Sequence, residues 1–363
     1  MEQVVVAGRV ARPEAALGAG ERIWRDARTR LLAAAGVVLV HSAYPPGHAV
    51  LAALPPGSRL LASAGFQLLV SVPVNAFVLL AFLSLGPRVA AGVPTRQLLR
   101  TAARRLVPAH LAWVTAFLAL RALAEHALPG PRAVVEGVVL GTAASHLYFT
   151  PLLLALTAFA PALSRRLPGP ATLALGAAAA ALASLGLHLW LGRDDAWRAA
   201  ASGIIGYVPF ALAGLWLHRS WGGVAPPPAR ARRVAAVAGA VALLSAALLV
   251  HAAVNAAGGL PVRSPISWLA GLGFGLSVPI LLLCLPSRPW AGRARLARLA
   301  GLTLGVYFVH PIFVQLLRRA EAAFAADPAL ALGLVLPNAA LAAALSLGTV
   351  MLLARSPLRK MVA

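Results

Sequence analysis

Long apolar runs separated by short polar connectors form the dominant pattern of this sequence. The runs recur near residues 29–46, 65–85, 106–124, 146–164, 171–191, 202–218, 234–253, 266–285, 299–317 and 330–354. A helix of about 20 apolar residues crosses the hydrocarbon core of a bilayer, and a helix satisfies its own backbone hydrogen bonds there. The pattern therefore predicts an all-α polytopic membrane protein with about ten transmembrane helices.

The polar segments predict one continuous membrane domain with a tail at each end. Residues 1–28 are polar, carry several arginines and lack apolar periodicity. The membrane domain is expected to cover 29–354, and residues 355–363 form a second, short basic tail. A secretory signal peptide is the rival interpretation of the N-terminal region, but nine further apolar runs follow the first one in either case.

Composition supports this class, and the distribution of charge gives an orientation. Hydrophobic residues make up 60% of the 363 positions and charged residues 12%, whereas about 25% of a soluble domain is charged. With the N-terminus placed inside, 24 of the 32 Lys and Arg residues fall on inner segments and 8 on outer connectors. Basic residues concentrate on the cytosolic side of membrane proteins. Both termini are therefore predicted to be cytosolic, and the formal charge of +22 indicates topology and not nucleic-acid binding.

The first apolar run carries a cation at its start, Arg30, and an imidazole near its end, His41. Eleven helical steps separate the two residues by roughly 16 Å, about half the thickness of the hydrocarbon core. A titratable group at that depth is costly to bury and is a candidate functional residue. His310 lies at a similar expected depth in the ninth run, and His146 opens the fourth run from the outer side. We therefore expect the three histidines to converge on one site in the outer half of the membrane, although a purely structural role is an equal alternative for His310.

The remaining chemistry of the sequence narrows the function. Histidine is the side chain suited to act as a base near neutral pH. The sequence contains no His-Glu-x-x-His pattern, no Gly-x-Ser-x-Gly elbow and a single cysteine, Cys284, so neither a metal site nor a disulfide is expected. Membrane carboxylates, which proton-coupled transporters use, are absent from the apolar runs. Gly271-Leu-Gly-Phe-Gly275 lies within an apolar run and predicts a close helix-packing face.

A row of arginines precedes the third apolar run. Arg96, Arg100 and Arg104 are spaced by four, which places them on one helical face, and Arg105 follows directly. Guanidinium groups bind phosphate through paired hydrogen bonds. Anionic lipid headgroups attract the same residues, so a phosphate site and simple contact with membrane lipids are both open interpretations.

Several stretches, in order and spacing, resemble the acyltransferase-3 family of membrane proteins. The first is the Arg30 to His41 spacing, and the others are Arg104-Arg-Leu-Val-Pro108, His146-Leu-Tyr-Phe-Thr-Pro151, Tyr207 through Arg219, which resembles the glucan-modifying branch, and Gly305-Val-Tyr-Phe-Val-His-Pro311. The similarity spans about residues 22 to 318. Two departures stand out: Ala27 replaces a frequent aspartate, with Asp26 beside it, and the second run keeps Val72-Pro73 but lacks the usual Phe-rich Ser-Gly.

The resemblance implies an integral O-acyltransferase of a bacterial-type inner (plasma) membrane. Such a protein takes an acyl group, acetyl or another short chain, from cytosolic acyl-CoA to a hydroxyl of an extracytoplasmic or lipid-linked carbohydrate, without a metal. Carried over to this chain, the resemblance assigns the coenzyme's phosphates to the cytosolic arginines: Arg30, Arg96, Arg100, Arg104 and Arg105. It assigns His41 as the general base, with His310 or His146 orienting that base or contacting the acceptor; a covalent acyl-histidine is the less favoured route.

Two other classes compete with an acyltransferase. A transporter or flippase for a lipid-linked sugar or exopolysaccharide would need alternating access and often shows internal repeats, and no repeat between the halves is evident. A purely structural membrane partner leaves the Arg30–His41 run unexplained. No feature of the sequence predicts an oligomeric state.

Overall fold

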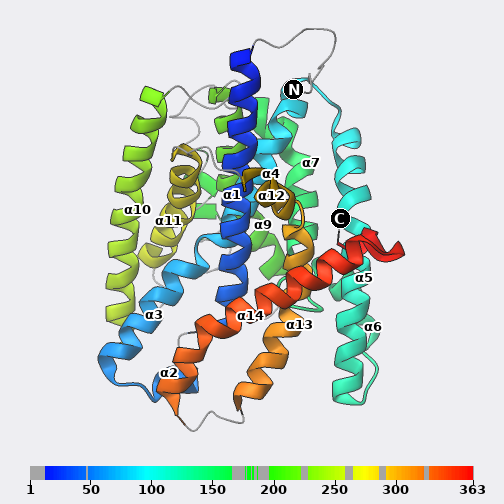
Figure 1. Ribbon diagram of the computed structural model, residues 1–363, viewed down its shortest axis with the longest axis vertical. Helices are drawn as coiled ribbons and strands as arrows, with labels where there is room; N and C mark the ends of the chain where they lie inside the picture. Colours follow the sequence, from blue (N-terminus) through cyan, green and yellow to red (C-terminus); the bar gives the residue numbers. More distant parts are fainter. Residues whose placement is uncertain are drawn as a thin grey trace.

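Helices joined by short turns are the only regular secondary structure in the described part of the chain (Figure 1). The computed structural model describes residues 13–45, 48–165, 196–221, 228–257, 265–285, 292–322 and 327–362, with scattered positions between 176 and 186. The elements are α1 (Pro13–Ser42), α2 (Ala49–Ala52), α3 (Pro56–Val70), α4 (Pro73–Ala90), α5 (Thr95–Glu125), α6 (Pro131–Leu140), α7 (Phe149–Arg165), α9 (Ala196–Trp221), α10 (Pro228–Ala257), α11 (Pro265–Cys284), α12 (Arg293–Ala300), α13 (Thr303–Ala322), α14 (Pro328–Ala354) and the 3-10 helix η1 (Pro357–Met361). The predicted all-α class is confirmed, and the predicted run 171–191 lies largely outside the described residues.

Only some helices satisfy a strict test of length and hydropathy for crossing a membrane. Within the described residues these are Thr95–Glu125, Ala229–Val254, Pro328–Ala354 and the segment Pro56–Ala90, which combines α3 and α4. The α12–α13 pair adds a fifth span if its two parts, bent by 66°, are counted together. The protein is thus a helical membrane protein, while the count of ten helices and the cytosolic termini stay predictions.

The first two predicted runs have different boundaries in the structure. Helix α1 begins at Pro13, within the predicted tail. The run 65–85 is divided between α3 and α4 because Pro73, at the start of α4, has no N–H to continue the preceding helix. The Asn75 amide donates to the Ser71 carbonyl at this break at 2.6 Å. A side chain at Gly36 would collide with the Pro73 ring, so glycine there lets α1 pass directly against this break.

The predicted outer connector between α5 and α7 contains a helix of its own. Figure 1 shows α6 beside the lower part of α5. His110 of α5 donates from Nε2 to the Val138 carbonyl of α6 at 2.8 Å, which fixes the two helices to each other. Helix α6 ends at Gly141, whose φ of +75° is the left-handed conformation that favours glycine. A turn then carries the chain through His146 into α7.

Glycines and small residues set the closest helix contacts. A side chain at Gly86 of α4 would meet the His218 ring of α9, and one at Gly214 of α9 would meet the α4 backbone. In α11, Gly271 and Gly275 lie against the α3–α4 junction, and Gly273 lies against Ser245 of α10. The predicted packing face at Gly271–Gly275 is therefore confirmed, and close approach of small residues is the usual way that membrane helices associate.

The apolar side chains divide between an inner core and an outer belt. The core joins α1, α4, α5, α7, α9 and α13. Large apolar residues such as Leu123, Leu243 and Leu352 are 70 to 75% exposed, as expected for side chains that face lipid. The end of the chain packs on the core: the Trp113 indole donates to the Met361 carbonyl at 2.9 Å, and Val362 is 1% exposed.

Labelling at the two ends of the α5–α6 unit tests the predicted orientation. Arg96 lies in the first turn of α5 and Arg132 in the first turn of α6, and both are exposed. In a protein with Cys284 replaced by alanine, we expect an impermeant maleimide added from outside to modify Arg132→Cys and to spare Arg96→Cys, because inner segments carry the excess of basic residues. Modification of both positions from the same side would overturn the orientation.

Candidate functional site

Three histidines from distant parts of the chain meet inside the helical core. His41 lies in the last turn of α1, His146 in the turn before α7 and His310 in α13. The ring centroids are 5.0 Å apart for His41 and His310, 5.5 Å for His146 and His310, and 6.4 Å for His41 and His146. The expected meeting of the three side chains is confirmed, while their position in the outer half of the membrane stays a prediction; these residues are called the histidine cluster below. Among the described residues, no three His, Cys, Asp or Glu side chains are arranged to hold a metal ion.

A proline fixes the orientation of His310. Pro311 lies within α13 and has no N–H, so the carbonyl of Tyr307, four residues earlier, lacks its helical partner. His310 fills this vacancy: its Nδ1 lies 2.8 Å from the Tyr307 carbonyl and 3.2 Å from that of Val306. A carbonyl only accepts, so Nδ1 carries the proton, and the neutral ring presents Nε2 as an acceptor. This Nε2 is buried and has no hydrogen-bond partner among the described residues.

The backbone of His146 is held in place by Tyr307. The Tyr307 hydroxyl donates to the His146 carbonyl at 2.6 Å, and the Tyr307 ring lies 5.6 Å from the imidazole. The ring of Phe117 packs on another side, at 5.3 Å. The imidazole lies near the backbone of Phe308, but neither ring nitrogen makes a hydrogen bond of good geometry with any described residue.

A polar network begins two residues beyond His41. Arg318 donates to the Ala43 carbonyl at 2.5 Å, and its guanidinium carbon lies 5.5 Å from the centroid of the Tyr44 ring. The Tyr44 hydroxyl donates to Glu321 at 3.1 Å, and the Asn338 amide donates to the other oxygen of that carboxylate. The network therefore ties the end of α1 to α13 and α14. The sequence prediction missed these residues, although Arg318 follows His310 by eight positions and so lies on the same side of α13.

A cavity of about 280 Å³ lies on the other side of the histidine cluster. Its exposed end is polar and cationic, with Arg30, Arg88 and Arg105 and the hydroxyls of Ser84 and Thr101. Its buried end is apolar and aromatic; the residues there are Phe77, Leu80, Phe149, Leu153 and Tyr307. The cavity is thus suited to a long ligand with an anionic head and an apolar end.

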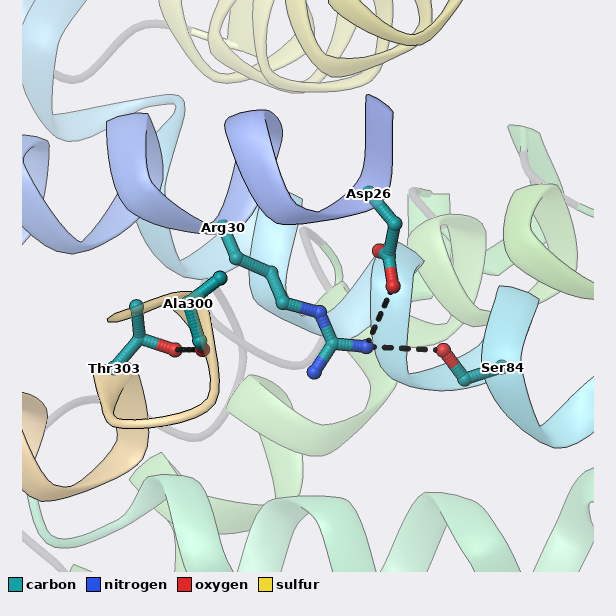
Figure 2. A network of polar contacts seen from close by, with 5 residues as sticks. All are labelled: Asp26, Arg30, Ser84, Ala300 and Thr303. Carbon is teal, nitrogen blue, oxygen red and sulfur yellow. Dashed lines mark hydrogen bonds and ion pairs between the residues drawn. The ribbon is translucent and has the colours of Figure 1, made fainter. Parts of the chain in front are cut away.

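Arg30 is oriented by neighbours on two helices (Figure 2). Its Nη2 lies 3.0 Å from the Asp26 carboxylate, one turn earlier in α1, and donates to the Ser84 hydroxyl of α4 at 3.0 Å. Asp26 therefore supplies the carboxylate at the position beside Ala27, where the resemblance places an aspartate. Figure 2 also shows Thr303 bonded to the Ala300 carbonyl, which closes the α12–α13 bend beside Arg30.

Only one of the predicted arginines on α5 lines the cavity. Leu98, Thr101, Ala102 and Arg105 lie there, at the 3-and-4 spacing of one helical face. The predicted row of Arg96, Arg100 and Arg104 is exposed on a different face of α5, and its role stays a prediction. Arg88 was not predicted; it lines the cavity and donates to the Thr101 hydroxyl at 3.1 Å. The sequence feature that could have identified Arg88 is its position in a predicted cytosolic connector, close to the other basic residues.

Tyr307 joins the two halves of the site. Its ring lines the buried end of the cavity and lies 5.6 Å from His146 and 6.1 Å from His310. None of the three histidines lines the cavity itself. A ligand that fills the cavity therefore reaches the histidine cluster only across Tyr307 and its neighbours.

Comparison with known proteins identifies one family. A family model described as an acyltransferase domain matches residues 29–355. No curated protein and no solved structure matches the chain.

Replacement of Gly141 tests how tightly the turn that carries His146 is packed. Gly141 and Gly92 both have positive φ, at +75° and +71°, and alanine in this conformation costs about 1–2 kcal/mol at either position. A side chain at Gly141 would in addition collide with the backbone of Leu147, whereas Gly92 has open space around it. We expect Gly141→Ala to lower the unfolding temperature in detergent clearly more than Gly92→Ala does. An equal decrease in unfolding temperature for the two variants would mean that the turn around Gly141 can rearrange to accept a side chain.

Proposed function

The chain belongs to the acyltransferase-3 family, since the family's model matches most of its length, and on this premise we propose the reaction of this membrane acyltransferase. It moves a short acyl group, such as acetyl, from cytosolic acyl-CoA to a hydroxyl of an extracytoplasmic or lipid-linked carbohydrate. The observation that carries the proposal is the cavity: it is cationic at its exposed end and ends at Tyr307, beside the histidine cluster.

The donor is proposed to bind with its phosphates outward and its thioester inward. Arg30, Arg88 and Arg105 offer guanidinium groups to the phosphates at the exposed end, where paired hydrogen bonds give a firm hold. The apolar lining accepts the narrow arm of the coenzyme. The same arginines carry positive charge at the predicted cytosolic side, which is where acyl-CoA is available.

His41 is proposed as the general base. Its neutral imidazole accepts the proton of the acceptor hydroxyl while the hydroxyl oxygen attacks the thioester carbonyl carbon. The tetrahedral intermediate collapses, the carbon–sulfur bond breaks, and the departing thiolate takes the proton from the imidazolium. His310 supports this role, because its unpartnered Nε2 is a ready acceptor for an N–H of His41, whose ring centroid is 5.0 Å away. The remaining nitrogen of His41 then carries the basic lone pair.

The acceptor is proposed to approach from the side of the polar network. Arg318 and Glu321 of α13 contact Ala43 and Tyr44, the residues that follow His41 closely in the sequence. This end of α1 is the outer one in the predicted topology, so a carbohydrate carried by a membrane lipid has a direct approach to the base. Donor and acceptor therefore reach the histidine cluster from opposite directions.

The His41→Ala variant tests the base. Loss of a general base lowers a rate by a factor of about 10² to 10⁴, so acyl transfer in proteoliposomes should fall by that factor. Binding of acyl-CoA should stay close to that of the unmodified protein, because the imidazole acts on the acceptor proton. His251→Ala is the control, since His251 is exposed on α10 and outside the cluster. Transfer at the normal rate by a folded His41→Ala protein would contradict the assignment.

Two pairs of arginine variants test the donor site. Arg88 and Arg105 line the cavity, whereas Arg96 and Arg100 lie on an exposed face of α5. If phosphates bind at the cavity, Arg88→Gln and Arg105→Gln should each weaken acyl-CoA binding about tenfold or more, and Arg96→Gln and Arg100→Gln should have smaller effects. Charge-assisted hydrogen bonds of this kind contribute about 1.5–3 kcal/mol. The reverse order would favour the predicted row on the exposed face as the phosphate site.

A further inference from the structure

We propose that Phe77, Phe149 and Tyr307 together set the length of the acyl chain that this protein accepts. The proposal rests on the proposed function, because it assumes that the cavity holds the donor. It assigns a specificity role to Phe77 and Phe149, whose side chains carry no reactive group. These three residues are called the aromatic wall below.

The aromatic wall lines the part of the cavity that lies next to the histidine cluster. The three rings come from α4, α7 and α13, and all three line the cavity. Their centroids form a compact triangle: 5.1 Å between Phe149 and Tyr307, 6.1 Å between Phe77 and Phe149, and 6.2 Å between Phe77 and Tyr307. Such tilted and edge-on contacts stabilise aromatic pairs beyond their buried area. The wall is therefore a packed unit and not three independent side chains.

Two members of the wall are fixed by their surroundings. Tyr307 is 3% exposed and its hydroxyl is committed to the His146 carbonyl at 2.6 Å. Phe149 is 4% exposed and lies at the first residue of α7. Phe77 is only partly buried, because one side of its ring faces the cavity. Phe77 is therefore the member whose size decides how far a ligand extends.

The dimensions of the cavity favour a short chain. Sites for small molecules commonly measure about 300–1,000 Å³, and this cavity of about 280 Å³ lies just below that range. A cavity of this size accommodates the narrow arm of the coenzyme and a small acyl group. Because protein interiors are close-packed, a longer acyl chain has to displace the wall, and displacement of Tyr307 strains its hydrogen bond to the His146 carbonyl. Acetyl fits without this movement, whereas each added methylene increases the clash.

The experiment compares donors of different length on the full-length protein in proteoliposomes. Acetyl-, butanoyl- and hexanoyl-CoA are supplied to the unmodified protein and to Phe77→Ala, Phe77→Leu and Phe149→Leu, and kcat/KM is measured for each donor. One methylene in an apolar pocket changes kcat/KM by a factor of about 10 to 200. We expect the unmodified protein to prefer acetyl-CoA, and the ratio of hexanoyl to acetyl use to rise at least tenfold in Phe77→Ala, with a smaller rise in Phe77→Leu.

Phe159→Ala is the matched control, because Phe159 is on α7 like Phe149 but is 58% exposed. It should leave the ratio unchanged. If the unmodified protein uses acetyl-CoA but every folded wall variant keeps its ratio, the wall is not the determinant and the inference is overturned, while the proposed function stands. If the unmodified protein uses none of the three donors, the proposed function itself fails. The two conservative leucine variants keep the test decisive if Phe77→Ala does not fold.

Discussion

A missing N–H at Pro311 is the constraint on which the site depends. It leaves the Tyr307 carbonyl without its helical partner, and in a membrane core no water is present to donate a hydrogen bond to a free carbonyl. His310 donates to that carbonyl, so one histidine has a fixed proton, a fixed orientation and an acceptor nitrogen turned to the other side. A purely structural need of the helix thereby prepares a group that His41 can use.

Tyr307 gives this turn of α13 a second importance, because it belongs to both halves of the site. Its backbone carbonyl orients His310, its hydroxyl holds the turn of His146, and the residue lines the cavity. On one side lie cationic and apolar surfaces suited to a thioester, and on the other lie the histidines and the network around Arg318. In the proposed reaction, this separation keeps the thioester away from water until the acceptor is present.

The sequence predicted what depends on periodicity and depth, and missed what depends on packing. The helical class and the meeting of His41 with His310 follow from hydropathy and from equal distances to the cytosolic arginines. The division of the second run at Pro73 did not follow from hydropathy, because a hydropathy average does not show that proline lacks a backbone hydrogen-bond donor. Which face of α5 lines the cavity is decided by neighbouring helices. The sequence therefore did not separate Arg105, which lines the cavity, from the exposed row of Arg96, Arg100 and Arg104, and it missed Arg88. The network of Arg318 joins segments that are 275 residues apart, beyond the reach of any local pattern.

The bond between Tyr307 and His146 engages the main chain and not the imidazole. Position and chemistry at residue 146 are therefore separable by mutation, provided that the replacement fills the same buried space beside Phe117 and Tyr307. Such a replacement keeps the hydrogen bond from Tyr307, because the carbonyl that accepts it belongs to the main chain, and it removes only the imidazole. At His310 the opposite holds, since the ring itself is the partner of the freed carbonyl, and its removal alters reactivity and architecture in a single step.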